Sequence, residues 1–227
     1  MERDLCILDV TIPGNCGQLE GRLYYCNEGA SDRGIIICPP HPLLAGNLEN
    51  NVVQAVARKM AVSMPVLLFN YPAVGMSTHP SPGLPLFEYW HGLDQKGDYG
   101  MMSEEVKKVI QWSAGYFSRL HLVGYSFGAH MALTAMTKQV LSYAAIAPPL
   151  VEYDFTGMQS LSIPICTILA EDDGLLATPA DLPRPNDIIH NTIRGTDHFF
   201  LRREEEVATL IAEFILAIEL KGGETDA

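Results

Sequence analysis

The sequence predicts an α/β protein, a three-layer sandwich with a mostly parallel sheet of eight, or nearly eight, strands between two layers of helices. Short apolar runs such as GIIIC at 34–38 are typical of strands buried on both faces. These runs alternate with segments that carry apolar residues at helical spacing. Such alternation favours parallel strands joined by crossover helices, whereas the two earliest runs, separated by a short turn, predict an N-terminal antiparallel pair.

The elements can be placed along the chain in order. Strands are expected at 5–12, 17–26, 34–38, 65–70, 119–124, 141–148, 163–170 and 186–195. Helices are expected at 48–62, from a cap at Ser103 to about Gly115, from the segment after Gly128 to about Lys138, and at 201–220. Residues 71–100 are rich in Pro and Gly and are expected to form a long loop.

The length favours a single domain over residues 1–227. With 227 residues, the chain can bury one sizeable core but is short for two. Only about fifteen residues separate the strands at 141–148 and 163–170, which leaves no room for a large cap at that point. The 76–100 segment is therefore the candidate for a long insertion loop near the active site.

The charge balance bears on partners. The formal net charge is −12, which disfavours nucleic acid and anionic membranes. The N-terminus shows no secretory signal, and no apolar run reaches the roughly 18 residues that a membrane helix needs. We therefore expect a cytoplasmic protein. Its five cysteines form no C-x-x-C pair, so no metal and no cofactor is expected.

The segment GYSFG, residues 124–128, is the strongest candidate for chemistry. It follows the strand at 119–124 and precedes a helical run, which is the context that a nucleophile elbow requires. Gly124 and Gly128 would let strand and helix approach closely. Ser126 would then be the nucleophile, although a tight turn with a bystander serine is an alternative that this segment alone leaves open.

A serine nucleophile needs a base and an acid, and in this chain order both should follow Ser126. Among the later histidines, His130 falls in the helix after the serine and His190 in a strand. His198 follows the last strand and is the expected base. The acid should follow the strand at 163–170, where AEDDG offers three carboxylates. Asp173 is preferred, because the first acidic residue is expected partly in the strand, and Glu171 and Asp172 are then expected to be solvated charges of the loop.

An oxyanion hole needs two N–H donors. One is the backbone N–H of Phe127, directly after the nucleophile. The other should come from PPHPLLAGN, where Leu43 is the first residue after His41-Pro42 with a free N–H. His41 precedes the serine in sequence and is expected to have a structural or substrate-binding role.

Four segments together give the chain a resemblance to the α/β-hydrolase superfamily over nearly its whole length: CPPHPLLAGNLENNVVQAVARKMA, FNYPAVGMS, GYSFGAHMAL and GTDHFF. The chain is most similar to the small lidless hydrolases related to dienelactone hydrolases and acyl esterases. That resemblance implies Ser126 as nucleophile, Asp173 as acid, His198 as base, and Leu43 and Phe127 as oxyanion donors. Pro72-Ala73 departs from the Arg-Gly of many relatives, and Ala170 stands where they often have glycine.

These features predict a serine hydrolase that cleaves an ester or thioester of a small-molecule acyl substrate through an acyl-enzyme. Acyl transfer or carbon–carbon bond hydrolysis by the same residues remains an alternative, as does a non-catalytic binding module. The aromatic residues of the 76–100 segment could wall an acyl pocket or cover the sheet edge; they are Phe87, Tyr89, Trp90 and His91.

Overall fold

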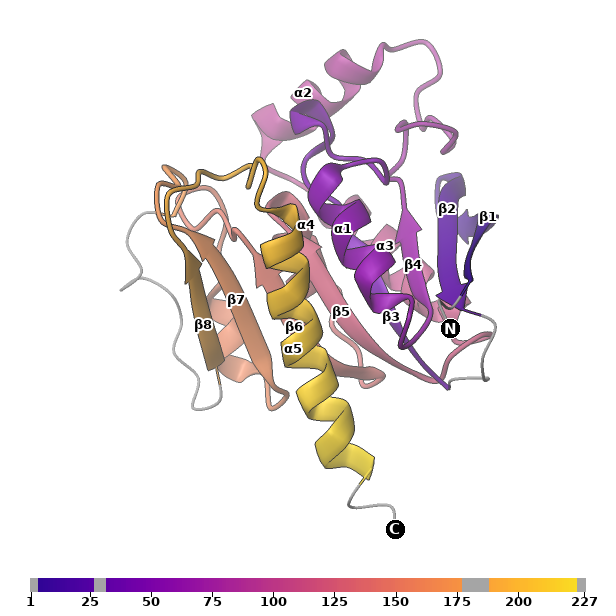
Figure 1. Cartoon of the computed structure of the whole chain (residues 1–227). Helices are drawn as coiled ribbons and strands as arrows, with labels where there is room; N and C mark the ends of the chain where they lie inside the picture. Colours follow the sequence, from indigo (N-terminus) through magenta and orange to yellow (C-terminus); the bar gives the residue numbers. More distant parts are fainter. Residues whose placement is uncertain (1–3, 27–31, 177–187, 224–227) are drawn as a thin grey trace.

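The computed structural model describes residues 4–26, 32–176 and 188–223. At its centre is an eight-stranded sheet with strand order β1-β2-β4-β3-β5-β6-β7-β8 (Figure 1). The strands are β1 Leu5–Gly14, β2 Gly17–Cys26, β3 Arg33–Cys38, β4 Val66–Phe69, β5 Arg119–Tyr125, β6 Val140–Ile146, β7 Ile165–Ala170 and β8 Ile188–Ile193. β1, β2 and β4 pair antiparallel and the rest of the sheet is parallel, which confirms the predicted class.

Helices cover both faces of the sheet and complete the three layers. α1 (Asn51–Met60) and α5 (Glu204–Gly223) pack together on one face, while α3 (Gly100–Ser113) and α4 (Phe127–Thr134) lie on the other. Two clusters of buried apolar residues, one on each face, account for this arrangement. The strands β3, β4 and β5 have no exposed residue apart from Arg119 at the start of β5, as wholly apolar runs predict.

The segment expected to be a loop contains a helix, so that part of the prediction is wrong. Helix α2 spans Leu86–Lys96 and lies beyond the carboxyl ends of the parallel strands (Figure 1). Trp90 is fully buried and Tyr89 is 8% exposed, and the indole N–H of Trp90 donates to the Pro72 carbonyl at 3.3 Å. Tertiary packing thus stabilises a helix whose first turn has no side-chain cap.

Two helix boundaries also differ from the prediction. α3 begins at Gly100, so Ser103 is a buried residue within the helix and does not cap it. α4 ends at Thr134, four residues before the expected end at Lys138. The connection from β6 to β7 holds only the short 3₁₀ helix η2 (Thr156–Ser160), and the first two residues expected in the last strand lie outside the described residues.

Candidate active site

Ser126 occupies a strained turn between β5 and α4. Its backbone has φ 54° and ψ −122°, a region that residues with a side chain rarely adopt. The two flanking glycines are required by close contacts. A Cβ atom on Gly124 would strike the backbone of Gly128 and Ala129, and one on Gly128 would strike the carbonyls of Cys38 and Pro39. Strand and helix can approach this closely only with glycine at both positions, which confirms the steric reason inferred from the sequence.

Three side chains meet at the carboxyl edge of the sheet in one hydrogen-bonded chain. Ser126 Oγ lies 2.7 Å from His198 Nε2, and His198 Nδ1 lies 2.8 Å from Asp173 Oδ2. An ionised carboxylate can only accept, so Nδ1 carries the imidazole proton and Nε2 accepts from the serine hydroxyl. Ser126 is 4% exposed, His198 is 7% exposed, and the Asp173 side chain is fully buried. Low exposure strengthens electrostatic interactions among these groups.

The loop after β7 separates Asp173 from its acidic neighbours. Asp173 Oδ1 also accepts the N–H of Leu175 at 2.9 Å, which orients the carboxylate toward His198. Glu171 and Asp172 are exposed, and Glu171 instead accepts the N–H of Gly195. Asp197 is exposed and accepts the N–H of Phe199. Of these four carboxylates, only that of Asp173 contacts the imidazole.

A buried tyrosine anchors the loop that carries His198. Tyr125, the last residue of β5, donates its hydroxyl to the carbonyl of His198 at 2.8 Å. Its ring lies 6.0 Å from the imidazole, and burial raises the pKa of its hydroxyl. The residue beside the serine therefore holds the backbone of the histidine as well.

The two expected oxyanion donors differ in their surroundings. Phe127 is the first residue of α4, so its N–H has no partner within the helix. The N–H of Leu43 donates to Nδ1 of His41 at 3.3 Å. His41 Nε2 in turn lies 3.0 Å from Asp94 Oδ1, which also accepts the Tyr99 hydroxyl at 2.9 Å. Asp94 thus holds the proton on Nε2 and leaves Nδ1 free to accept from Leu43.

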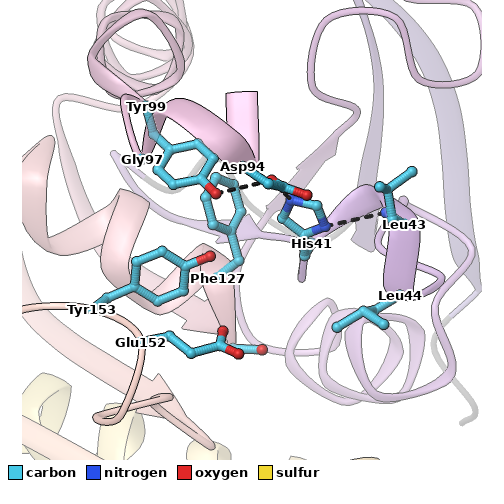
Figure 2. Close-up of a pocket in the computed structure, with 10 residues that line it drawn as sticks. His41, Leu43, Leu44, Asp94, Gly97, Tyr99, Phe127, Glu152 and Tyr153 are labelled. Atoms are coloured by element: carbon cyan, nitrogen blue, oxygen red, sulfur yellow. Dashed lines mark hydrogen bonds and ion pairs between the residues drawn. The ribbon is translucent and has the colours of Figure 1, made fainter. Parts of the chain in front are cut away.

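A cavity of about 530 Å³ opens beside Ser126 (Figure 2). Glu152 and Tyr153 lie on one side of it, and Leu43 and Leu44 lie on the other. The full lining is His41, Leu43, Leu44, Asp94, Gly97, Tyr99, Ser126, Phe127, Glu152 and Tyr153. The cavity is large enough for a small-molecule substrate.

Burial shifts the pKa of several groups in this cavity. Burial lowers the pKa of His41, against the opposing effect of Asp94, so the ring is neutral at pH 7. The pKa of Tyr153 is raised to about 12, first by burial and also by the charges of Glu152 and Asp94. Within the described part of the chain, no group of three or more His, Cys, Asp or Glu side chains could hold a metal ion.

Several solved hydrolase structures are similar to this chain over most of its length. The chain is 25% identical to an α/β serine hydrolase homologue from Coxiella burnetii, over 91% of this chain and 96% of that one, with a TM-score of 0.74. A lidless α/β serine hydrolase from Xanthomonas campestris is 22% identical over 93% and 94% of the two chains, also with a TM-score of 0.74. A dienelactone hydrolase from Anabaena variabilis has a TM-score of 0.70 at 14% identity, over 94% and 98%.

The chain has the α/β-hydrolase fold. In sequence it is 26% identical over 220 residues to an uncharacterized protein of Rickettsia prowazekii, covering 89% of this chain and 86% of that protein. No family model matches the sequence. No helix in residues 4–26, 32–176 and 188–223 is both long and apolar enough to span a bilayer.

Some residues expected near the substrate of this α/β-hydrolase-fold protein lie elsewhere. Phe87, Tyr89, Trp90 and His91 do not line the cavity beside Ser126, so the predicted pocket wall is corrected. Helix α2 turns Tyr89 and Trp90 into the core, while Phe87 and His91 stack on one another at the exposed surface, 5.5 Å between ring centroids. Trp90 contributes only indirectly, by packing edge-on against His41 at 5.2 Å.

Six lining residues were missed by the sequence analysis, and four of them carry polar side chains. Asp94 and Tyr99 belong to the segment expected to be a loop, and no local pattern marks them as facing the serine. Glu152 and Tyr153 follow β6, whose carboxyl end lies at the same edge of the sheet as Ser126. Position after a parallel strand was therefore a usable signal for this second pair.

Proposed function

We propose that the protein is a serine hydrolase that cleaves an ester or thioester of a small-molecule acyl substrate through an acyl-enzyme on Ser126. The observation that carries the proposal is the hydrogen-bonded chain from Ser126 Oγ to His198 to Asp173, with distances of 2.7 and 2.8 Å. A strained serine joined to an oriented histidine is the arrangement that serine hydrolysis requires. The serine hydrolases and esterases of similar structure support the same class.

In the acylation step, Ser126 Oγ attacks the substrate carbonyl carbon and His198 Nε2 takes the hydroxyl proton. The tetrahedral oxyanion accepts hydrogen bonds from the N–H groups of Phe127 and Leu43. The Leu43 N–H, which donates to His41 Nδ1 in this structure, then donates to the oxyanion instead of, or in addition to, His41. Asp173 stabilises the imidazolium. His198 then protonates the leaving alcohol or thiol as its bond to carbon breaks.

Deacylation reverses the roles. Water attacks the acyl carbon while His198 takes one of its protons. The tetrahedral intermediate collapses, His198 returns the proton to Ser126 Oγ, and the carboxylic acid leaves. The cycle uses Ser126, His198, Asp173 and the two N–H donors, and it consumes one water per ester cleaved.

A panel of p-nitrophenyl esters and acyl thioesters of increasing chain length tests the proposal. We expect wild type to turn over at least one of them, and Ser126→Ala to lower kcat/KM by about 10⁴-fold or more. Full turnover by Ser126→Ala would exclude the acyl-enzyme. Adding a simple alcohol as a second acceptor separates hydrolysis from acyl transfer, because a transferase gives mainly the new ester.

A further inference from the structure

The cavity beside Ser126 is acidic. Of the ten residues that line it, Asp94 and Glu152 are carboxylates and none is lysine or arginine (Figure 2). His41 adds no positive charge at neutral pH, because burial lowers its pKa. Both carboxylates line the same cavity, and Asp94 is hydrogen-bonded there to His41 and Tyr99.

Three aromatic rings of the cavity lining pack together between these carboxylates. The ring centroid of Tyr99 lies 4.9 Å from that of Phe127, and the ring centroid of Tyr153 lies 5.8 Å from each of these two. The interplanar angles of 63° to 71° are those of edge-to-face packing. Aromatic faces attract cations, most strongly where water is partly excluded. Aromatic rings combined with carboxylates are the set of groups that binds an alkylammonium ion, and they bind an anionic group poorly.

We propose that this cavity selects esters or thioesters that carry a positively charged nitrogen, as an amine or a quaternary ammonium. This specificity rests on the hydrolase function proposed above. Glu152 and Asp94 supply the opposite charge, and Tyr99 and Tyr153 supply the rings. An anionic acyl group would be repelled by the two carboxylates of the same cavity. The cavity would therefore discriminate between substrates by repelling anions as well as by attracting cations. The net charge of −12 adds steering of cations toward the molecule.

Matched pairs of substrates test this specificity. Butyrylcholine is compared with its carbon isostere, in which tert-butyl replaces trimethylammonium, and this pair places the charge on the alcohol side. The methyl ester of trimethylammonio-butyrate and its tert-butyl isostere place it on the acyl side. For at least one pair we expect kcat/KM to be about tenfold or more higher for the cationic member. The pair that shows the preference identifies which side of the ester the cavity binds.

Two single-charge variants separate local binding from overall charge. In Glu152→Gln the ratio of cationic to neutral kcat/KM should fall by about fivefold or more. Glu88→Gln is the matched control, because Glu88 is an exposed carboxylate of α2 that does not line the cavity. It should leave the ratio within about twofold of wild type, since a distant exposed charge is screened by salt.

Binding of a cation to the cavity can be measured without turnover. Calorimetric titration with tetramethylammonium chloride should show binding that Glu152→Gln weakens and Glu88→Gln does not. Equal or faster cleavage of both neutral isosteres, or equal loss in the two variants, would overturn the specificity while leaving the hydrolase proposal intact. If no ester is turned over but tetramethylammonium still binds, the hydrolase proposal is overturned and the cation site stands. If there is neither turnover nor tetramethylammonium binding, the cation site is overturned as well.

Discussion

At the scale of single residues, position within the acid loop decides which carboxylate orients His198. Asp173 is buried and bonded both to His198 and to the N–H of Leu175, whereas Asp172, one residue earlier, is exposed. A carboxylate that accepts from Nδ1 holds the imidazole in the tautomer that can take the serine proton. The role proposed for Asp173 therefore depends on its charge and on its geometry.

We predict that Asp173→Asn lowers kcat by roughly 10³- to 10⁴-fold, because an amide N–H facing the imidazole favours the wrong tautomer. Asp172→Asn is the matched control and should retain wild-type kinetics. Steady-state assays with the best ester of the panel measure both. Equal losses in the two variants would show that the acid has been assigned to the wrong residue.

Tyr125 offers a second test at this scale. Tyr125→Phe removes the bond to the His198 carbonyl and leaves that carbonyl without this donor, so we expect a loss of about 1–2 kcal/mol in the free energy of unfolding. Activity should also fall several-fold, because the loop that carries His198, the proposed base, loosens. Urea unfolding and kcat/KM measure the two effects.

The control for Tyr125 is Tyr143→Phe, which removes an equally buried hydroxyl bond to the carbonyl of Ala129 in α4. It should cost a similar free energy of unfolding. Its effect on activity should be smaller, since Tyr143 has no bond to the His198 loop. If Tyr143→Phe lost more activity than Tyr125→Phe, the hydroxyl of Tyr125 would affect activity only by stabilising the fold.

At the scale of elements, helix α2 supplies part of the cavity. It carries Asp94, and the residues after it bring Tyr99 to the same space. Its sequence is a weak helix former, with Gly92 in the middle and no side-chain cap at Pro85. Burial of Trp90 against the core stabilises it instead.

Gly92→Ala should therefore stabilise the protein by about 0.5–1 kcal/mol. The backbone there has no positive φ, and a Cβ atom would meet no atom within 4 Å among the described residues. Gly97→Ala is the contrasting variant: its φ of 61° at the end of α2 favours glycine, and alanine there should cost about 1 kcal/mol. Thermal or urea unfolding measures the sign of the change in the free energy of unfolding for both variants. Destabilisation by Gly92→Ala would contradict the placement of Gly92 within a helix.

The elbow and α2 show why one part of the site was predictable and another was not. Ser126 could be recognised because its requirements are local: a buried strand, two glycines and a helix within a short stretch. Asp94 and His41 are 53 positions apart, and they meet because α2 packs through Trp90. No short pattern encodes that contact. The hydrogen bond from the Leu43 N–H to His41 Nδ1 was missed for the same reason. It depends on the imidazole tautomer, which the distant residue Asp94 sets.

Across the whole molecule, several buried or half-buried histidines link stability to pH. Burial lowers the pKa of His41, His121 and His130. His121 is fully buried; its Nδ1 lies 2.8 Å from the Ser142 hydroxyl, and its Nε2 lies 3.1 Å from Glu219 of α5. It therefore joins the centre of the sheet to the C-terminal helix.

The sign of the pH dependence follows from the direction of these shifts. Between the lowered folded pKa and the unfolded value of about 6.5, the unfolded chain binds more protons, so stability falls as pH falls. We predict a lower urea midpoint at about pH 5.5 than at about pH 7.5, and a smaller difference in His121→Gln. An unchanged difference in that variant would show that His121 contributes nothing to the effect.

The overall fold was accessible from the sequence because the pattern of apolar runs reports burial directly. The runs of β3, β4 and β5 are mostly apolar and lie in the middle of the sheet. The cavity beside Ser126 was not accessible in the same way, because its lining combines the loop after β3, the segment at α2 and the loop after β6. Its position is a property of the assembled molecule.

The proposed function requires that Ser126 is an activated serine. Treatment of the native protein with a fluorophosphonate, followed by intact mass spectrometry and peptide mapping, tests it most directly. We predict a single adduct, located on Ser126, and strongly slowed labelling in His198→Ala, which lacks the base. No adduct in the native protein, or an adduct on a different residue, would show that Ser126 is not the nucleophile.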